Sequence, residues 1–199
     1  MSDVKQRIAK LTEDRIHLLA ATEDKAMLAV LRTGLGKAPG DVPEISEFLF
    51  RGMDKDLMGK GLKPSYAEWA VYAAMTLFSL HQQGSDIKNA CAHVEGRSFS
   101  KALATYAKSP GVKEENVTKR LNVILKARPP EGTAYYLRNI IPMLRGAGLG
   151  FDYGRLAADL FLYQGKYQSG IRLSWARDYY RECDWIEQTQ KNNKKEDHK

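Results

Sequence analysis

Apolar residues recur at every third or fourth position along most of the chain, the spacing that places them on one side of an α-helix. In the clearest segment, Trp69, Tyr72 and Leu80 follow one another at this spacing. Ser65 and Glu68 stand just before them at the separation of a capping box, in which two side chains satisfy free amides at a helix start. The sequence contains no β-branched runs bounded by Asn-Gly or Asp-Gly, which would indicate hairpins. The pattern therefore predicts an all-α protein.

Eight or nine helices are predicted, separated by segments that contain Gly and Pro. They cover approximately residues 2–20, 23–34, 44–51, 65–84, 98–109, 113–127, 133–145, 152–163 and 169–188. Thr133 and Asp152 are the expected N-caps of their helices, because their side chains can accept hydrogen bonds from first-turn amides. Pro142 is expected to kink or shorten the last turn of the helix at 133–145.

The order of these helices predicts two parts. An N-terminal helical bundle is expected over residues 1–110, packed on a smaller C-terminal helical bundle over residues 111–190. Pro110-Gly111 interrupts the helical pattern and marks the expected border. Residues 191–199 include no apolar residue and are predicted to form a disordered polar tail.

Positive charge is concentrated in the middle of the chain. The formal net charge is +7 and the isoelectric point is about 9.3. Residues 86–145 carry eleven basic and five acidic residues, whereas residues 1–85 carry eleven of each. A basic excess that served solubility alone would have no reason to gather in one segment, so contact with a nucleic acid is the favoured interpretation.

Within this segment, basic residues occur in pairs seven positions apart. The pairs are Lys101 with Lys108, Lys119 with Lys126, and Arg138 with Arg145. Seven residues are close to two helical turns, so each pair is expected to stack along its helix about 10 Å apart, at a rise of about 1.5 Å per residue. Rows of cations at this distance suit a polyanion better than a small substrate.

The predicted helix at 113–127 shows this arrangement most clearly. Val117, Leu121 and Ile124 define its apolar side, while Lys119 and Lys126 stack away from that side. No acidic residue follows Lys119 on the helix, so this surface is expected to have no internal counter-charge. A bound phosphate chain would supply one.

Aromatic residues divide into two groups. Five of them share helical spacing with other apolar residues and are expected in the core; they are Trp69, Tyr72, Phe78, Trp175 and Tyr179. The second group is open to two interpretations, core packing or stacking on single-stranded bases, and consists of Tyr135, Tyr153, Tyr163 and Tyr167. Tyr135 and its neighbour Tyr136 precede Arg138 and are the best candidates for stacking, because an exposed ring beside a cation is what such stacking uses.

Patterns typical of enzymes are incomplete. His93 and Glu95 match half of a zinc deaminase signature, but its Pro-Cys-x-x-Cys half is missing. Cys91 and His93 alone would give a metal only two ligands. The Gly-containing stretches at 34–36, 59–61 and 146–150 fit neither a dinucleotide nor a Walker pattern and are predicted to be turns. We therefore expect no enzyme, no catalytic residue, no metal site and no cofactor.

The start of the chain lacks the apolar core of a signal peptide. The longest apolar run, from Ala70 to Leu80, has about half the length that a membrane span needs. Two cysteines, Cys91 and Cys183, make no disulfide framework. These features predict a cytoplasmic protein without a membrane partner.

Eight segments occur in the order and spacing of one known family. They are residues 31–36 (LRTGLG), 39–44 (PGDVPE), 69–74 (WAVYAA) and on to 80–81 (LH), 96–103 (GRSFSKAL), 119–127 (KRLNVILKA), 137–138 (LR), 149–160 and 171–180 (IRLSWARDYY). Together they resemble the small subunit of the type I-E CRISPR effector complex Cascade, the CasB-type subunit, over about residues 25–180. Their order and the chain length carry the resemblance, since no single segment is diagnostic.

The resemblance implies an all-helical, non-catalytic protein that is present in two copies among the other Cascade subunits. It would contact crRNA and the target and displaced DNA strands and so stabilise the R-loop, while base pairing with the guide supplies sequence specificity. The positions that match the charged face of the family are Lys101, Lys119, Arg120, Lys126 and Arg138, with weaker matches at Arg97, Arg128, Arg145 and Lys166. The chain departs from the family at Lys101 and Lys126, where relatives often have Arg, and in its longer first helix.

Two other functions fit the charge pattern. A stand-alone helical DNA-binding regulator would need a recognition helix that reads bases, and no short helix-turn-helix segment stands out. A structural adaptor could use the same basic face to bind an acidic protein. Binding that survives nuclease treatment and does not respond to added DNA would favour the adaptor.

Overall fold

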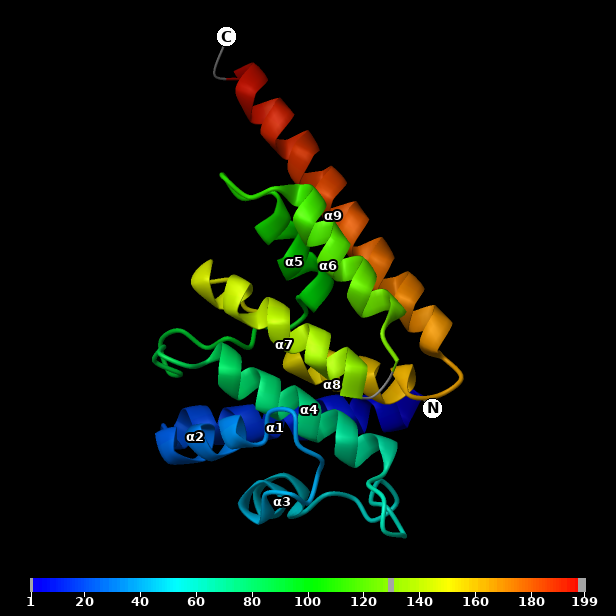
Figure 1. Cartoon of the computed structure of the whole chain (residues 1–199). Helices are drawn as coiled ribbons and strands as arrows, with labels where there is room; N and C mark the ends of the chain where they lie inside the picture. Colours follow the sequence, from blue (N-terminus) through cyan, green and yellow to red (C-terminus); the bar gives the residue numbers. More distant parts are fainter. Residues whose placement is uncertain (1, 129–130, 197–199) are drawn as a thin grey trace.

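The protein is described by a computed structural model that covers residues 2–128 and 131–196. In these residues the chain forms nine α-helices and a single strand-like bridge, between His93 and Phe151 (Figure 1). The helices are α1 Ser2–Thr22, α2 Lys25–Thr33, α3 Pro43–Phe50, α4 Tyr66–His81, α5 Phe99–Ala107, α6 Glu114–Lys126, α7 Glu131–Gly146, α8 Tyr153–Tyr163 and α9 Gln168–Glu196. The all-α prediction is confirmed.

Helix α4 lies at the centre of the fold and packs against α1, α2, α3, α7 and α8. Its small residues Ala70, Ala73 and Ala74 are buried, which lets neighbouring helices approach on several sides. The predicted capping box is present: the amide of Glu68 donates to Ser65 Oγ (3.0 Å) and the amide of Ser65 donates to Glu68 Oε2 (2.6 Å). The sequence therefore located the start of the central helix correctly.

Helices α5, α6 and α9 form the part of the molecule above α4 in Figure 1, with α9 as its long outer helix. Trp175 of α9 is fully buried, stacks on Tyr163 at 5.2 Å between ring centres, and donates from Nε1 to Asp159 Oδ2 at 2.8 Å. Helix α8 also packs on α1 and α4, and the buried apolar residues form one connected cluster. A division at Pro110-Gly111 stays a prediction.

Two helix ends differ from expectation. Asp152 caps α8 as predicted, since its side chain accepts from the amide of Arg155 at 2.8 Å. Thr133, in contrast, lies buried inside α7, which already begins at Glu131. Pro142 lies inside α7 as well, four residues before its end. Helix α9 continues to Glu196, over most of the segment predicted to be disordered; the Lys and Glu residues of that stretch favour helix without needing an apolar face. Residues 197–199 lie outside the described residues.

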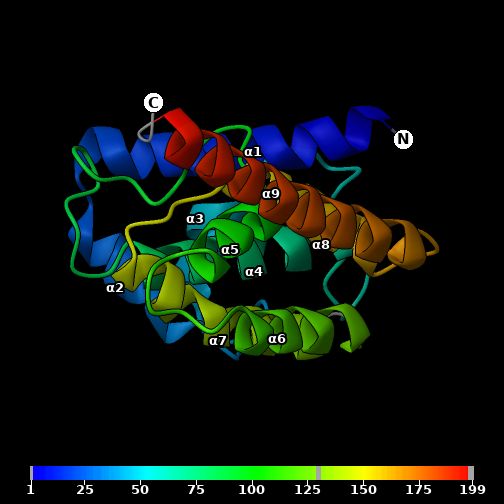
Figure 2. The same ribbon diagram turned by 90° about the horizontal axis from the view of Figure 1, so that it is seen from above.

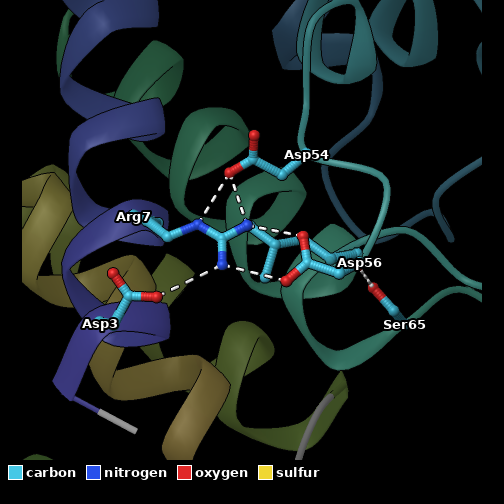
Figure 3. A network of polar contacts seen from close by, with 6 residues as sticks. Asp3, Arg7, Asp54, Asp56 and Ser65 are labelled. Atoms are coloured by element: carbon cyan, nitrogen blue, oxygen red, sulfur yellow. Dashed lines mark hydrogen bonds and ion pairs between the residues drawn. The ribbon is translucent and has the colours of Figure 1, made fainter.

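Helix α1 is an integral part of the core rather than an appendage. Ile8, Ile16 and Leu19 are buried against the rest of the fold. At its exposed start, the Arg7 guanidinium pairs with Asp54 and Asp56 of the loop before α4, both at 2.6 Å (Figure 3). These hydrogen bonds lower the pKa of Asp56. The network ties the start of α1 to the 51–65 loop.

In the described part of the chain, no helix is both long enough and apolar enough to cross a membrane.

Candidate nucleic-acid interface

Helix α6 has one buried side and one charged side. Val117, Leu121 and Ile124 are buried, as the sequence predicted, and Lys119 and Lys126 are exposed. Figure 2 shows α6 and α7 side by side at the edge of the molecule opposite α1. The charged side of α6 is therefore free of the helices that form the core.

One expectation about this helix needs correction. Lys119 Nζ lies 2.5 Å from Glu115 Oε1, so the surface does have an internal counter-charge, which comes from the turn before Lys119 rather than from the residues after it. Both side chains are largely exposed. An exposed i,i+4 pair of this kind contributes only about 0.3–0.5 kcal/mol, so a phosphate can replace the carboxylate at little cost.

Four further cations are exposed on α6, on α7 and in the connection between them: Arg120, Lys126, Arg128 and Arg138. Among the described residues, none of these four lies within 4.0 Å of a carboxylate. Together with Lys119 they form what we call the α6–α7 surface. It comprises four positive charges on two consecutive, packed helices and a fifth in the connection between them.

Lys108, the second member of the first basic pair, is not available to a ligand. Its side chain is only 11% exposed, and its ammonium pairs with Glu114 of α6 at 2.5 Å and with Glu187 of α9. Burial opposes the charge, but the hydrogen bonds to the two carboxylates outweigh it and raise the pKa of Lys108. The row predicted from Lys101 and Lys108 is therefore broken: Lys108 links three helices.

Lys101 is half-exposed and lies 3.9 Å from Glu182. It lines a shallow groove with Asp178, Arg181, Glu182 and Trp185 of α9. Two cations and two carboxylates meet there, so the groove has little net charge. The structure brings Lys101 near α9, away from the cations of α6 and α7.

Three other predicted positions have structural partners or lie elsewhere. Arg145 Nη1 donates to the carbonyl of Leu80 (3.0 Å) and to Gln83 Oε1 (3.1 Å), and so provides a hydrogen bond to a backbone carbonyl at the end of α4. Arg97 donates to Thr105 Oγ1 at 2.9 Å. Lys166 is exposed between α8 and α9, with its ammonium 5.4 Å from the centre of the Tyr167 ring.

A pocket of about 770 Å³ opens beside Arg138. The 34–38 loop, α4 and α7 enclose it, and we call it the α4–α7 pocket. Tyr135, the candidate for base stacking, lines it together with Tyr66, Lys37 and Lys63. Sequence reasoning missed the two lysines, because only the tertiary fold brings the loops that carry them to the start of α7.

The residues that suggested metal chemistry have structural roles. His93 Nδ1 accepts from the amide of Tyr153 at 3.1 Å, which joins the 91–97 loop to α8. Burial raises the pKa of both thiols, that of Cys183 to about 11. Within the described residues, no group of three or more His, Cys, Asp or Glu side chains could hold a metal ion.

Residues 27–180 match the family model of the CRISPR-associated protein Cse2. The chain belongs to the Cse2 family. The match confirms the resemblance to the CasB-type small subunit of Cascade. It includes α6, α7 and the whole lining of the α4–α7 pocket, so both features lie within the Cse2 region.

Solved structures of low sequence identity share this Cse2 fold. CasB from Thermobifida fusca has a TM-score of 0.69 and 22% identity, covering 87% of this chain and 97% of that chain. A Cse2-family protein from Thermus thermophilus has a TM-score of 0.63 and 24% identity, over 86% and 97%. A chain of a "CRISPR RNA-guided surveillance complex" has a TM-score of 0.70 and 19% identity, over 94% and 99%. The comparison with curated proteins gave no match.

Proposed function

We propose that this Cse2-family chain is a non-catalytic small subunit of a type I-E CRISPR ribonucleoprotein and that its α6–α7 surface binds the nucleic-acid backbone. The observation that carries the proposal is the set of five exposed cations on α6, on α7 and in the connection between them, four of them without a carboxylate within 4.0 Å in the described part of the chain. Such a surface neutralises phosphates without reading bases, which suits a complex whose guide RNA supplies the specificity.

In this role the chain acts together with the other Cascade subunits, a second copy of itself and crRNA. It holds the target and displaced DNA strands after the guide has invaded the duplex. Exchange of duplex DNA for a heteroduplex is nearly balanced in free energy, so modest contacts between protein and backbone decide whether the R-loop persists. Contacts from the α6–α7 surface would supply part of that stabilisation.

The experiment that tests the proposal compares R-loops made by the assembled complex with the wild-type chain, without it, and with the K119A/R120A/K126A variant. Permanganate reactivity of thymines in the displaced strand measures the open fraction. We expect the open fraction to fall when the chain is absent and when it carries the three substitutions. K10A/K25A/K55A removes the same net charge from exposed lysines on other parts of the surface and should behave as wild type. Equal opening in all four samples would refute the role.

A further inference from the structure

We propose that the α4–α7 pocket receives one unpaired base of a single-stranded nucleic acid. The inference rests on the proposed function and adds a specific subsite to it. The pocket lies beside Arg138, which is also part of the α6–α7 surface. A strand that follows the cations of that surface therefore passes the mouth of the pocket.

The size and lining of the pocket suit a flat, mostly apolar group. Its volume of about 770 Å³ is within the range of small-molecule sites. Trp69, Tyr72, Ala73 and Leu77 of α4 contribute apolar surface to its wall. The pocket is not enclosed, and the exposed Tyr135, Tyr66 and Arg138 are among the residues that line it, so a base can enter from solvent.

Exposed aromatic rings stand at the pocket. Tyr135 on α7 is 61% exposed and Tyr66 at the start of α4 is 53% exposed. Tyr135 is braced by an edge-on contact with Tyr136, whose ring centre lies 5.2 Å away. Exposed rings that line an apolar pocket offer stacking surface to a base of any sequence.

Charge around the pocket favours an anion. Lys37, Lys63 and Arg138 line it, against one carboxylate, Glu131. Among the described residues, no carboxylate lies within 4.0 Å of any of these three cations. The phosphates on either side of an inserted base would meet these cations, whereas a neutral apolar side chain of a protein partner would leave them unused.

The pocket is preformed because the 34–38 loop is tightly held. Tyr72 Oη donates to the carbonyl of Gly34 at 3.1 Å. A Cβ at Gly34 would lie 2.6 Å from Ile45 Cδ1 and 2.6 Å from Tyr72 Oη, so a larger residue there would have to displace both side chains. Gly36 has a φ of +80° and would place a Cβ 3.6 Å from Arg138 Nη1. The loop thus lies against Arg138 of α7, and a ligand need not first order it.

The test measures binding of the full chain to a fluorescent single-stranded oligonucleotide and to its duplex at fixed salt. The Y135A variant should bind the single strand about tenfold more weakly, the loss expected when one stacked base is released. Its duplex affinity and its salt slope should equal those of wild type, because no charge has changed. Y135F keeps the ring and should bind as wild type. Tyr135 is exposed, so the substitution should not affect folding, which circular dichroism checks.

The outcomes separate the two proposals. Single-strand binding by Y135A that equals that of wild type, with the salt dependence of wild type intact, would overturn the base pocket and leave the α6–α7 surface standing. A wild-type chain that binds no single strand would overturn both. As a second variant, A134L extends a half-buried residue of the pocket lining into the cavity and should also weaken binding of the single strand alone.

Discussion

Replacing Lys119, Arg120 and Lys126 by Ala is expected to make single-strand binding much less sensitive to salt. The five phosphate contacts of the α6–α7 surface contribute about −3.5 to the slope of log affinity against log salt, and the two of them that remain in the variant contribute about −1.4. Each contact contributes to the slope because a neutralised phosphate releases its counterion. The change in slope therefore counts the contacts that were removed.

The corresponding difference in affinity is large. Through the contacts of this surface, a fourfold rise in salt, from about 50 to about 200 mM, should weaken wild-type binding about a hundredfold and binding of the triple variant about sevenfold. Fluorescence anisotropy with a labelled oligonucleotide measures both slopes. Ala is a good helix former, so α6 should persist in the variant, and the only ion pair lost among the described residues is the exposed one between Lys119 and Glu115.

The matched control is again K10A/K25A/K55A, which carries the same net charge as the triple variant. It should keep the wild-type slope, because the salt dependence of binding is set by contacts of the α6–α7 surface and not by overall charge. If the two variants shared one slope, the nucleic acid would be responding to net charge and the assignment to the α6–α7 surface would be wrong.

Unfolding free energy is expected to fall by about 3 kcal/mol as the pH is lowered from 6.5 to 4, through His81 alone. His81 ends α4 and is buried, and its Nδ1 lies 2.8 Å from the hydroxyl of Tyr153. Burial, followed by the positive charge of Arg145, lowers its pKa from 6.5 to about 4. The native ring is therefore neutral at pH 5, where the unfolded chain carries a proton on it.

The direction of the pH dependence of stability follows from this difference in proton binding between the native and unfolded states. Because the unfolded state binds more protons between pH 4 and 6.5, the contribution of His81 is complete above pH 6.5 and is lost as the pH falls through about 4. Two carboxyls, Glu13 and Asp159, have raised pKa values and act in the opposite direction. The difference between wild type and H81Q isolates the histidine.

Urea unfolding of wild type and H81Q at a series of pH values between 7 and 4 measures this contribution. The wild-type curve should lose stability relative to H81Q as the pH falls. Parallel curves for wild type and H81Q would mean that His81 does not control stability in this range.

The fold was predictable where the deciding interactions are local. Ser65 with Glu68 and Asp152 mark helix starts through partners three residues away, and the buried side of α6 follows from its own spacing. Thr133 was misread because a Thr early inside a helix looks the same in sequence as an N-cap. The continuation of α9 beyond residue 188 depends on helix propensity, which apolar spacing does not reveal.

The candidate site was predictable only in part, because charge patterns do not show tertiary partners. Lys108 meets Glu187, 79 positions away, and Arg145 meets Gln83, 62 positions away. In the sequence both side chains therefore looked available to a ligand, whereas in the structure they bind other residues of the chain. Lys37 and Lys63 were missed for the same reason: they are far from Arg138 in sequence, and only the fold brings them to the pocket beside it. Exposed cations on a single helix, by contrast, were identified correctly as exposed.

Purification of the tagged chain from its own host at moderate salt tests the central claim most directly. Mass spectrometry should identify several larger CRISPR subunits that elute with it, and sequencing should find RNAs derived from CRISPR repeats. Recovery of the chain with neither, from cells that express the other subunits and after crosslinking to retain weak contacts, would contradict its proposed place in the ribonucleoprotein.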